Sequence, residues 1–275
     1  MNNLSGQLKP RKRFGQNFLQ DREIIRKIAQ VIYPQKSDKL VEIGPGLGAL
    51  TLELLPLVDS LDVIEFDRDI IPKLKENAAQ YADILHVHQA DVLQFDFASL
   101  YLNDNKLRIV GNLPYNISSP ILFHALKFIS IIKDIHIMLQ QEVAERIVAS
   151  PGGKDYGRLS VMVQYHCRGE MLFNISPKAF FPEPKVNSSF IRLTPLEKKA
   201  FLAKNFIVFE TIVREAFNHR RKTIRNSLKN IISESDLELL GIDSNRRPEE
   251  LSVDDFVRIS NVSGGNNEEL IMKNE

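Results

Sequence analysis

The segment with the clearest chemical potential follows an apolar run at residues 107–110. It places Asn112, Leu113, Pro114 and Tyr115 in direct succession. The Asn112 side-chain oxygen and the Leu113 carbonyl are hydrogen-bond acceptors, and Pro114 restricts the backbone so that this carbonyl points inward. Two such acceptors can hold an amine whose lone pair is delocalised into a ring while its nitrogen becomes pyramidal. Since Tyr115 offers a flat face for an extruded base, the segment predicts chemistry on the exocyclic amine of adenine.

A glycine turn and two acidic residues predict a site for a nucleotide-type cofactor. The apolar run 40–43 leads into Gly44 and Gly46, which let the backbone turn tightly and pass close to a ligand. Glu65 ends the next apolar run, where a carboxylate can accept hydrogen bonds from both hydroxyls of a ribose. Asp91 follows the third run and can accept a hydrogen bond from a cofactor adenine, although a helix cap or turn is an equal alternative. The glycine pattern by itself also fits NAD.

Chain order distinguishes between these alternatives. Taken alone, the Asn112 segment also fits an ordinary Pro-containing turn. Here it follows the glycine turn, Glu65 and Asp91 in the order in which successive strands would present them. This order favours S-adenosylmethionine as the methyl donor, because its sulfonium is itself the electrophile and the protein only has to align the amine and exclude water. We therefore expect neither a metal ion nor a nucleophilic side chain in the reaction.

The elements that position these residues follow from the pattern of the first 140 residues. Apolar, β-branched runs alternate with helical stretches, and the runs are 40–43, 61–65, 84–87, 107–110 and 135–139. Such alternation predicts βαβ units in a parallel sheet with helices on both faces. Two further runs, 161–165 and 189–193, have no long helical pattern between them. We expect these two runs to form an antiparallel pair at the sheet edge.

Changes in pattern along the chain predict three regions. Residues 1–194 are expected to form the cofactor-binding catalytic domain with a basic N-terminal arm, including a helix that starts at Asp21. The β pattern then stops, and helical periodicity predicts a small all-helical RNA-binding domain at 195–262. Its last helix is expected to span Pro248 to Ile259. The polar segment 263–275 is expected to be disordered.

Composition excludes several classes of protein. The 275 residues are 43% hydrophobic and 26% charged with a net charge of +1, which is typical of a globular chain without a strong global field. The single Cys167 excludes an internal disulfide and a thiolate zinc site, and no stretch approaches the roughly 20 apolar residues needed to cross a bilayer. His86 and His88 lack a third metal ligand nearby. We therefore expect a cytoplasmic, metal-free protein that does not enter membranes.

Lys and Arg side chains are concentrated in places suited to phosphate contacts. The residues predicted to bind RNA lie in the N-terminal arm, in a glycine-containing loop and on one face of a C-terminal helix: Arg11, Lys12, Arg13, Lys154, Arg214, Arg221, Lys222 and Arg225. A solvated helix face without a partner is the alternative for the last four.

Over nearly its whole length the sequence resembles the ribosomal RNA adenine dimethyltransferases. The segments that carry the resemblance are 11–19, 41–51, 112–115, 142–146, 156–160 and 180–189. The resemblance implies a Rossmann-like, seven-stranded class I methyltransferase sheet followed by a small helical domain. It also implies a set of residues that contact S-adenosylmethionine: Asn17, Leu19, Gly44, Glu65, Asp91 and Asn112.

The resemblance further implies a substrate. Family members transfer two methyl groups to each of two neighbouring adenines in a hairpin near the 3′ end of small-subunit (16S) rRNA, which suggests a pre-ribosomal particle as the partner of a monomeric enzyme. Phe180 aligns with a family Phe that sandwiches the target base opposite Tyr115, although the adjacent Phe181 leaves the register open. Glu183 replaces a Pro that many relatives have, which affects only the expected rigidity of that loop.

Three alternative functions remain at the level of sequence. An NAD-dependent oxidoreductase would use the glycine turn and Glu65 but leaves Asn112 to Tyr115 unexplained. A large-subunit rRNA methyltransferase of the macrolide-resistance type shares the chemistry. It fits the Pro-rich segment, residues 180–189, and the helical domain less well. A non-catalytic ribosome assembly factor would have no physical need for an intact acceptor motif.

Overall fold

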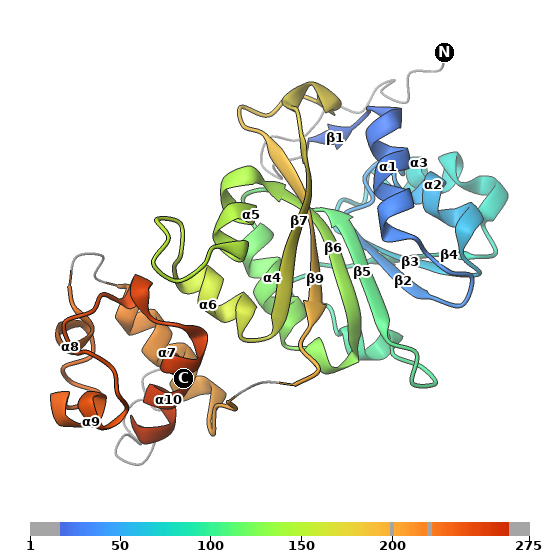
Figure 1. Ribbon diagram of the computed structural model, residues 1–275. Helices are drawn as coiled ribbons and strands as arrows, with labels where there is room; N and C mark the ends of the chain where they lie inside the picture. Colours follow the sequence, from blue (N-terminus) through green and yellow to red (C-terminus); the bar gives the residue numbers. More distant parts are fainter. Residues whose placement is uncertain (1–16, 199–200, 219–221, 264–275) are drawn as a thin grey trace. The chain divides into compact units, whose positions relative to one another are not determined.

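A mixed sheet of seven strands is the centre of the fold within the residues that the computed structural model describes, 17–198, 201–218 and 222–263 (Figure 1). The strands lie in the order β4-β3-β2-β5-β6-β9-β7. Their bounds are β2 Lys39–Ile43, β3 Leu61–Glu65, β4 Leu85–Gln89, β5 Leu107–Asn112, β6 Ile132–Gln140, β7 Cys167–Ile175 and β9 Ser188–Pro195. Strands β2 to β6 pair in parallel and β9 pairs antiparallel with β6. This arrangement confirms the predicted α/β class with a largely parallel sheet.

Helices connect these strands and make up most of the C-terminal part. The α-helices are α1 Arg22–Ile32, α2 Thr51–Leu54, α3 Ile71–Asn77, α4 Ser118–Leu126, α5 Gln141–Val148, α6 Arg158–Gln164, α7 Phe206–Phe217, α8 Ile224–Ser227, α9 Glu234–Leu239 and α10 Val253–Ser263. Short 3-10 turns are η2 Leu55–Leu57, η3 Ala79–Tyr81, η4 Phe97–Leu100, η5 Ile129–Ile131, η6 Pro177–Ala179 and η7 Pro248–Glu250. A separate two-stranded sheet joins β1 Phe18–Leu19 to β8 Phe180–Phe181.

Helix α1 begins where the sequence predicts. The Asp21 carboxylate accepts hydrogen bonds from the backbone amides of Glu23 (2.9 Å) and Ile24 (3.2 Å), which satisfies two donors that a helix start leaves unpaired. One face of the helix is buried, with Ile25, Ile28, Ala29 and Ile32 at helical spacing. This face packs in one apolar cluster with Leu40, Val63 and Val110 of the sheet. The helix thereby covers the strands whose carboxyl ends carry the predicted site.

One strand prediction was wrong. Residues 161–164 belong to helix α6, Tyr165 is its C-cap, and the edge strand of the sheet is β7, which follows the helix. The helix begins where the Gly157 amide donates to the Ser160 hydroxyl at 2.9 Å. Residues 160–163 are all buried, so the run is apolar without a period of either 2 or 3.6, and periodicity cannot distinguish a buried strand from a buried helix. The other predicted run, 189–193, lies in β9 as expected.

The chain divides into two compact units. The first comprises Met1–Ala144 and Gly169–Pro195, and the second comprises Glu145–Arg168 and Leu196–Glu275. The sequence pattern predicts one boundary near residue 194; in the structure Glu145–Arg168 also belong to the second unit. The predicted tail lies outside the described residues, apart from Ser263, which ends α10.

Two helix predictions in the second unit need correction. The C-terminal helix expected to carry Arg214 and Arg225 on one face is not continuous, because α7 ends at Phe217 and α8 begins at Ile224. The predicted helix from Pro248 to Ile259 is likewise divided into η7 and α10. The Ser252 hydroxyl accepts from the Asp255 amide, and the Asp255 carboxylate accepts from the Ser252 amide, so a reciprocal cap starts α10 afresh.

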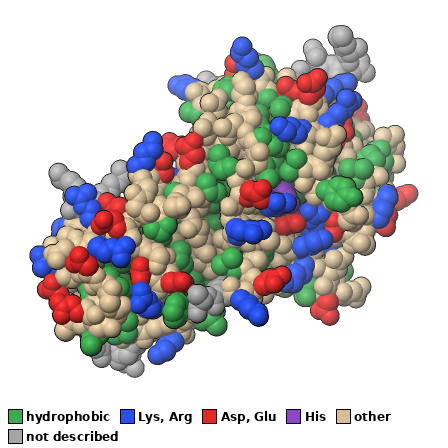
Figure 2. Space-filling model, viewed as in Figure 1, with side chains coloured by type: hydrophobic (Ala, Val, Ile, Leu, Met, Phe, Trp, Pro, Cys, Tyr) green, Lys and Arg blue, Asp and Glu red, His purple; other side chains and the backbone are tan. Residues whose placement is uncertain are grey.

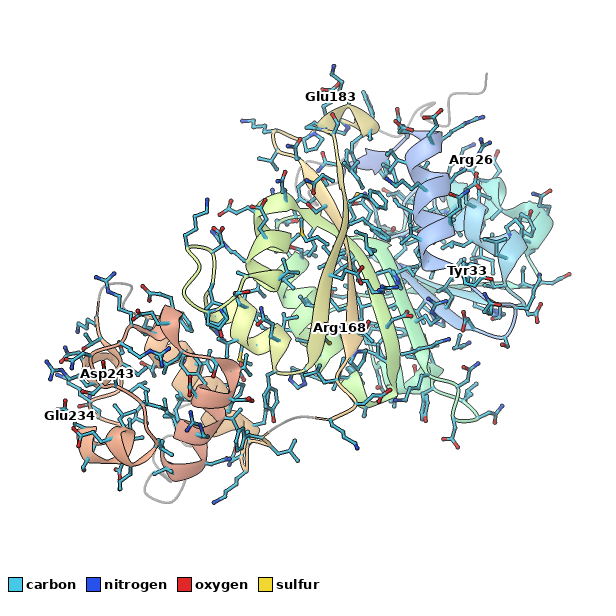
Figure 3. All side chains as sticks on the ribbon, viewed as in Figure 1. Arg26, Tyr33, Arg168, Glu183, Glu234 and Asp243 are labelled. Carbon is cyan, nitrogen blue, oxygen red and sulfur yellow. The ribbon has the colours of Figure 1, made fainter. Side chains whose placement is uncertain are left out.

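Acidic and basic side chains are interspersed on the visible face of the molecule (Figure 2). In the second unit, Glu234 of α9 is 3.3 Å from the guanidinium of Arg225 in α8, and it accepts a hydrogen bond from the Ser244 hydroxyl (Figure 3). The described helices are all too short or too polar to cross a membrane.

Candidate active site

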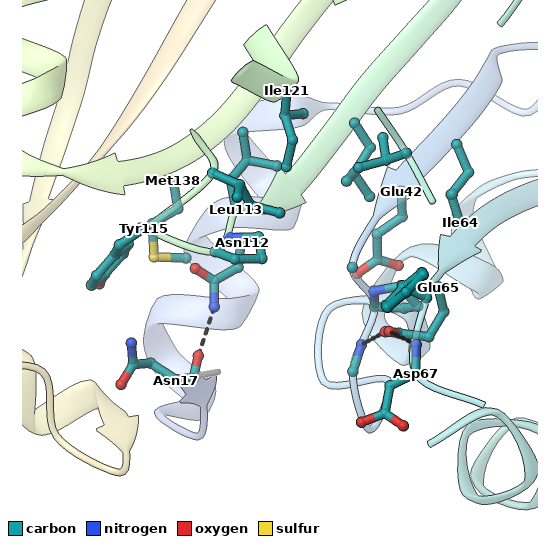
Figure 4. Close-up of a pocket in the computed structure, with 18 of the residues that line it drawn as sticks. Asn17, Glu42, Ile64, Glu65, Asp67, Asn112, Leu113, Tyr115, Ile121 and Met138 are labelled. Atoms are coloured by element: carbon teal, nitrogen blue, oxygen red, sulfur yellow. Dashed lines mark hydrogen bonds between the residues drawn. The ribbon is translucent and has the colours of Figure 1, made fainter. Parts of the chain in front are cut away.

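A cavity of about 380 Å³ opens at the carboxyl ends of the central strands (Figure 4). Its lining includes every residue predicted to contact the cofactor: Asn17, Leu19, Gly44, Gly46, Glu65, Asp91 and Asn112. Leu113, Pro114 and Tyr115 line the same cavity. The predicted cofactor residues and the predicted acceptor segment therefore share one space.

Gly111 of β5 lets β5 lie close to β2 at the point where the glycine turn begins. A Cβ atom on Gly111 would lie only 2.5 Å from the Ile43 carbonyl oxygen, so only glycine allows β5 to approach β2 at this level. Gly44 and Gly46 have positive φ angles of 66° and 55°, which favour glycine. This close approach places Asn112, at the end of β5, beside the glycine turn.

Glu65 is held in place by the same turn. Its two carboxylate oxygens accept hydrogen bonds from the Gly46 amide (3.3 Å) and the Asp67 amide (2.9 Å) (Figure 4). Burial raises the pKa of Glu65, and these two amides oppose the increase. The carboxylate is therefore oriented at the cavity before any ligand binds.

Glu42 is a cavity residue to which the sequence analysis assigned no role. It lies on β2, two residues before Gly44, and accepts a hydrogen bond from the Thr51 hydroxyl at 2.7 Å. Complete burial raises its pKa to about 7, and the nearby Glu65 adds to the increase. The sequence did contain a signal for this residue, because an acidic side chain is unusual inside an apolar run that leads into a glycine turn.

Asp91 forms the predicted turn and also lies at the cavity, where its role toward a cofactor stays a prediction. Its carboxylate accepts hydrogen bonds from the Leu93 amide (3.0 Å) and the Gln94 side chain (3.3 Å), as in an Asx-turn. The residue also lines the cavity. The turn therefore fixes the backbone around a carboxylate that still borders the predicted cofactor site.

The orientation of the Asn112 side chain is determined by a residue far away in the sequence. Its amide nitrogen donates to the Asn17 carbonyl at 2.9 Å. Because a carbonyl can only accept, the amino group of Asn112 must face Asn17, which leaves the side-chain oxygen as the acceptor on the other side. The N-terminal segment that contributes Leu19 to the cavity thus also orients the proposed acceptor.

Tyr115 is anchored through its hydroxyl. The Tyr115 hydroxyl and the Ser188 hydroxyl of β9 are 2.5 Å apart, and burial raises the pKa of Tyr115 while this hydrogen bond opposes the increase. Sequence analysis identified Tyr115 but not Ser188, because the two residues are 73 positions apart.

Phe18 is a second cavity residue that the sequence did not single out. A Cβ atom on Gly46 would lie 3.0 Å from the Phe18 ring, so the ring lies directly against the glycine turn. Phe18 pairs with Phe181 in the small β1–β8 sheet, and Leu19 pairs with Phe180. This pairing connects the N-terminal segment to the Pro-rich segment.

The prediction that Phe180 stacks on the target base is not supported by its position. The Phe180 side chain is only 3% exposed and packs in the core cluster with Leu19, whereas Phe181 is 50% exposed. Neither ring is among the residues that line the cavity in the described part of the chain. Adjacent strand residues face opposite sides, so one of two neighbouring Phe residues had to be buried, and the sequence does not say which.

The predicted RNA-binding residues do not form one continuous helix face. Arg11, Lys12, Arg13 and Arg221 lie outside the described residues. Arg214 on α7 is 3.3 Å from Glu215, and Arg225 on α8 is paired with Glu234, so both cations have acidic neighbours. Lys154 and Lys222 are exposed. The break between α7 and α8 is the physical reason for the difference.

Known proteins match this chain over almost its full length. The family described as "Ribosomal RNA adenine dimethylase" matches residues 7–263. The chain belongs to this family. The "Ribosomal RNA small subunit methyltransferase A" of Pseudomonas aeruginosa is 52% identical over 255 residues, which cover 93% of this chain and 95% of the relative. The protein of the same name from Saccharophagus degradans is 52% identical over 92% of this chain and 94% of its own length.

Solved structures of the family agree with the fold. A dimethyladenosine transferase from Plasmodium falciparum superposes with a TM-score of 0.77 at 27% identity, covering 90% of this chain and 98% of that chain. The 23S rRNA methyltransferase ErmE gives a TM-score of 0.68 at 25% identity, covering 89% and 98%. The Rossmann-like methyltransferase sheet implied by the resemblance is thereby confirmed, and the chain is an rRNA methyltransferase by family.

Proposed function

We propose that this protein uses S-adenosylmethionine to dimethylate the exocyclic amines of two adjacent adenines near the 3′ end of small-subunit rRNA. The observation that carries the proposal is the shared cavity: the Asn112 acceptor and the Glu65 carboxylate border one space of about 380 Å³. A methyl donor and a base held in one cavity can be aligned for direct transfer.

The cavity fits S-adenosylmethionine in charge and chemistry. Glu42 and Glu65 are buried carboxylates with raised pKa values, and within the described residues neither forms an ion pair with Lys or Arg. A cationic ligand would supply the missing positive charge. We propose that Glu65 accepts from the ribose hydroxyls, that Asp91 accepts from the cofactor adenine, and that Gly44 and Gly46 allow close backbone approach. When bound, the donor supplies an electrophilic methyl group on its sulfonium.

The acceptor amine is held by the residues after β5. The Asn112 side-chain oxygen and the Leu113 carbonyl accept its two hydrogens, which favours the pyramidal geometry in which the nitrogen lone pair can attack. Tyr115 stacks on the face of the extruded base. The proton that the methylated nitrogen must lose can pass to water after transfer. The protein thus contributes orientation and electrostatic stabilisation rather than a covalent intermediate.

The comparisons favour the small subunit over the large subunit as substrate. Relatives at 52% identity carry the small-subunit name, whereas ErmE, a 23S rRNA methyltransferase, is 25% identical. An NAD enzyme would not need Asn112 anchored to Asn17, and neither would a non-catalytic assembly factor. We also propose a pre-ribosomal particle as the form of the substrate, a monomeric enzyme and a cytoplasmic location. The exposed Lys154 and Lys222 are candidates for phosphate contacts together with the other predicted basic residues.

The decisive experiment is incubation of the protein with undermethylated small subunits and labelled methyl donor, followed by nucleoside analysis. We expect dimethyladenosine from small subunits and none from isolated large subunits. Asn112→Ala should lower kcat by about 10²–10³-fold, the usual cost of removing a transition-state hydrogen-bond partner. Asn105→Ala is the matched control, since its side chain also donates to a backbone carbonyl, that of Ser37 at 2.7 Å, but away from the cavity. Unchanged dimethylation by Asn112→Ala would refute the mechanism.

A further inference from the structure

We propose that Ser188 is a positioning residue for methyl transfer, which holds the Tyr115 ring in the orientation that stacks on the target adenine. This inference rests on the proposed function, because it assumes that Tyr115 contacts the base. Ser188 does not line the cavity within the described residues, so it acts only through Tyr115.

The Tyr115 ring is held at its far end by a hydrogen bond. Tyr115 lies in the loop between β5 and α4, is only partly buried and has no place in a strand or helix. Its backbone carbonyl accepts a hydrogen bond from the Ser118 hydroxyl at 3.3 Å, which fixes the loop but not the ring. At the far end of the side chain, the Tyr115 hydroxyl is 2.5 Å from the Ser188 hydroxyl. Backbone and ring are therefore held by two different serines.

Ser188 itself is rigid because of its place in the sheet. It is fully buried and is the first residue of β9, where it pairs with Gln140 of β6. Directly beside it, the Gln141 amide donates to the Asn187 carbonyl at 2.9 Å, so the chain is anchored before β9 begins. An aromatic side chain from a loop is thus attached to a buried, paired position of the sheet.

Strand β6 connects this anchor to the acceptor. Met138 of β6 lines the cavity (Figure 4). Its carbonyl accepts a hydrogen bond from the Leu113 amide at 3.3 Å. The strand that positions the acceptor carbonyl and the strand that positions the stacking ring are therefore neighbours. Both parts of the base site are set relative to the same framework, which keeps the distance between acceptor and stacking face constant.

Ser189 provides a matched control. It is also fully buried, but its hydroxyl donates to the Asn174 side chain at 2.7 Å. Ser188→Ala and Ser189→Ala therefore remove the same atom from neighbouring positions of one strand, and only the first removes a contact to Tyr115. A general effect of losing a buried hydroxyl would appear in both variants.

The test is a double-mutant cycle with Ser188→Ala and Tyr115→Phe, measured as dimethyladenosine formation on undermethylated small subunits. We expect Ser188→Ala to lower kcat about tenfold while the Kd for S-adenosylmethionine changes less than twofold, since one hydrogen bond that orients a group is lost. Tyr115→Phe should lose a similar factor, and the double variant should be no slower than the slower single variant. Ser189→Ala should retain wild-type kcat, and Ser188→Thr, which restores a hydroxyl, should recover most of the activity.

Two outcomes would overturn the inference: a Ser188→Ala enzyme as fast as Ser189→Ala, or effects of Ser188→Ala and Tyr115→Phe that multiply in the double variant. If Ser188→Ala fails to fold, the same cycle is run with Ser188→Cys, whose weaker hydrogen bond should give an intermediate kcat; wild-type kcat in that variant would equally overturn it. Failure of the proposed function is a separate result, because then the wild-type protein itself would form no dimethyladenosine.

Discussion

The pKa values of buried carboxylates are shifted in opposite directions at the two ends of the sheet. At the carboxyl end, Glu42 and Glu65 have raised pKa values and no Lys or Arg partner among the described residues. Near the amino end, Asp38 and Asp134 have lowered pKa values and share a buried guanidinium, that of Arg108. At the amino end the carboxylates have a cationic partner, whereas at the carboxyl end we propose that a bound cation would supply one.

At the amino end of the sheet, the buried guanidinium of Arg108 donates hydrogen bonds to two carboxylates and a backbone carbonyl. Arg108 donates to Asp38 at 2.6 Å, to Asp134 at 3.0 Å and to the Ile32 carbonyl at the end of α1 at 2.8 Å. Burial alone would raise the pKa of Asp38, but hydrogen bonds from the Gln35 amide, Lys133 and Arg108 together lower it. Every strong charge here has its partner, so the network ties α1 to β5 and β6 and leaves nothing for a ligand.

This difference distinguishes buried carboxylates that belong to a ligand site from buried carboxylates that only stabilise the sheet. Both ends bury acidic groups, and burial by itself therefore identifies neither. Buried carboxylates without an ion-pair partner, beside a glycine turn, are candidates for a ligand site. Buried carboxylates that share a guanidinium are instead part of the structure, since removing that partner would leave their charge uncompensated. Three experiments test this difference between the two ends of the sheet, and they are given in order of decreasing effect.

The largest effect is expected from Arg108→Leu. It removes the guanidinium that both carboxylates share, so Asp134 loses its Arg partner and Asp38 keeps only Lys133, at 2.9 Å. We expect the free energy of unfolding to fall by about 3–5 kcal/mol. Urea unfolding measures this change. The control is Arg192→Leu, which removes a partly exposed pair with Glu170 on the same sheet and should cost less than about 1 kcal/mol. We expect the ion-pair network at the amino end to have no catalytic role, so kcat of the folded Arg108→Leu variant should stay within about twofold of wild type. A large loss of kcat would contradict this expectation.

The pH dependence of the free energy of unfolding should reveal the titration of Glu42. Its pKa is about 7 in the folded protein and 4.5 ordinarily, so the folded state binds the proton more tightly. Stability should therefore be highest below pH 4.5 for this group and fall as pH rises to about 7, by up to about 3 kcal/mol. Asp38 and Asp134 have the opposite sign: their lowered pKa values stabilise the fold above pH 3.8, and this contribution is lost as pH falls further.

The measurement is urea unfolding of wild type and Glu42→Gln between pH 5 and 8. The Gln variant cannot ionise, so the decline between pH 5 and 7 should be smaller in it by the amount assigned to Glu42. Glu53→Gln on α2, whose carboxylate is partly exposed, is the control and should follow wild type. Parallel curves for wild type and Glu42→Gln would show that Glu42 does not titrate in this range.

The smallest of the three effects concerns cofactor affinity. Glu65→Ala removes the carboxylate proposed to accept from the ribose, and we expect the Kd for S-adenosylmethionine to rise about 10–100-fold, the loss of a charged hydrogen-bond acceptor. Isothermal titration measures it. Glu76→Ala, which removes an exposed partner of Lys73 on α3, should bind as wild type does. If Glu65→Ala binds normally, the unpaired carboxylates at the carboxyl end do not mark the ligand site.

Much of this protein could be predicted from short stretches of sequence. Helix α1, five parallel strands and the glycine turn follow from local periodicity, from the Asp21 cap and from the conformational freedom of glycine. The Asn112 segment was recognisable because its chemistry depends on residues that are adjacent in the chain. Family membership followed from the same segments and was confirmed by relatives.

The orientation of the site residues follows only from the tertiary structure, because it depends on contacts between residues that are distant in the sequence. Asn112 is oriented by Asn17, 95 positions away, and Tyr115 by Ser188, 73 positions away. Residues 161–164 form a helix because the buried apolar run 161–163 has no period of its own, so its conformation depends on the surrounding structure. Local pattern determines which residues can do chemistry, but the side that each side chain faces, and the charge state of the buried carboxylates, are set by long-range packing and burial.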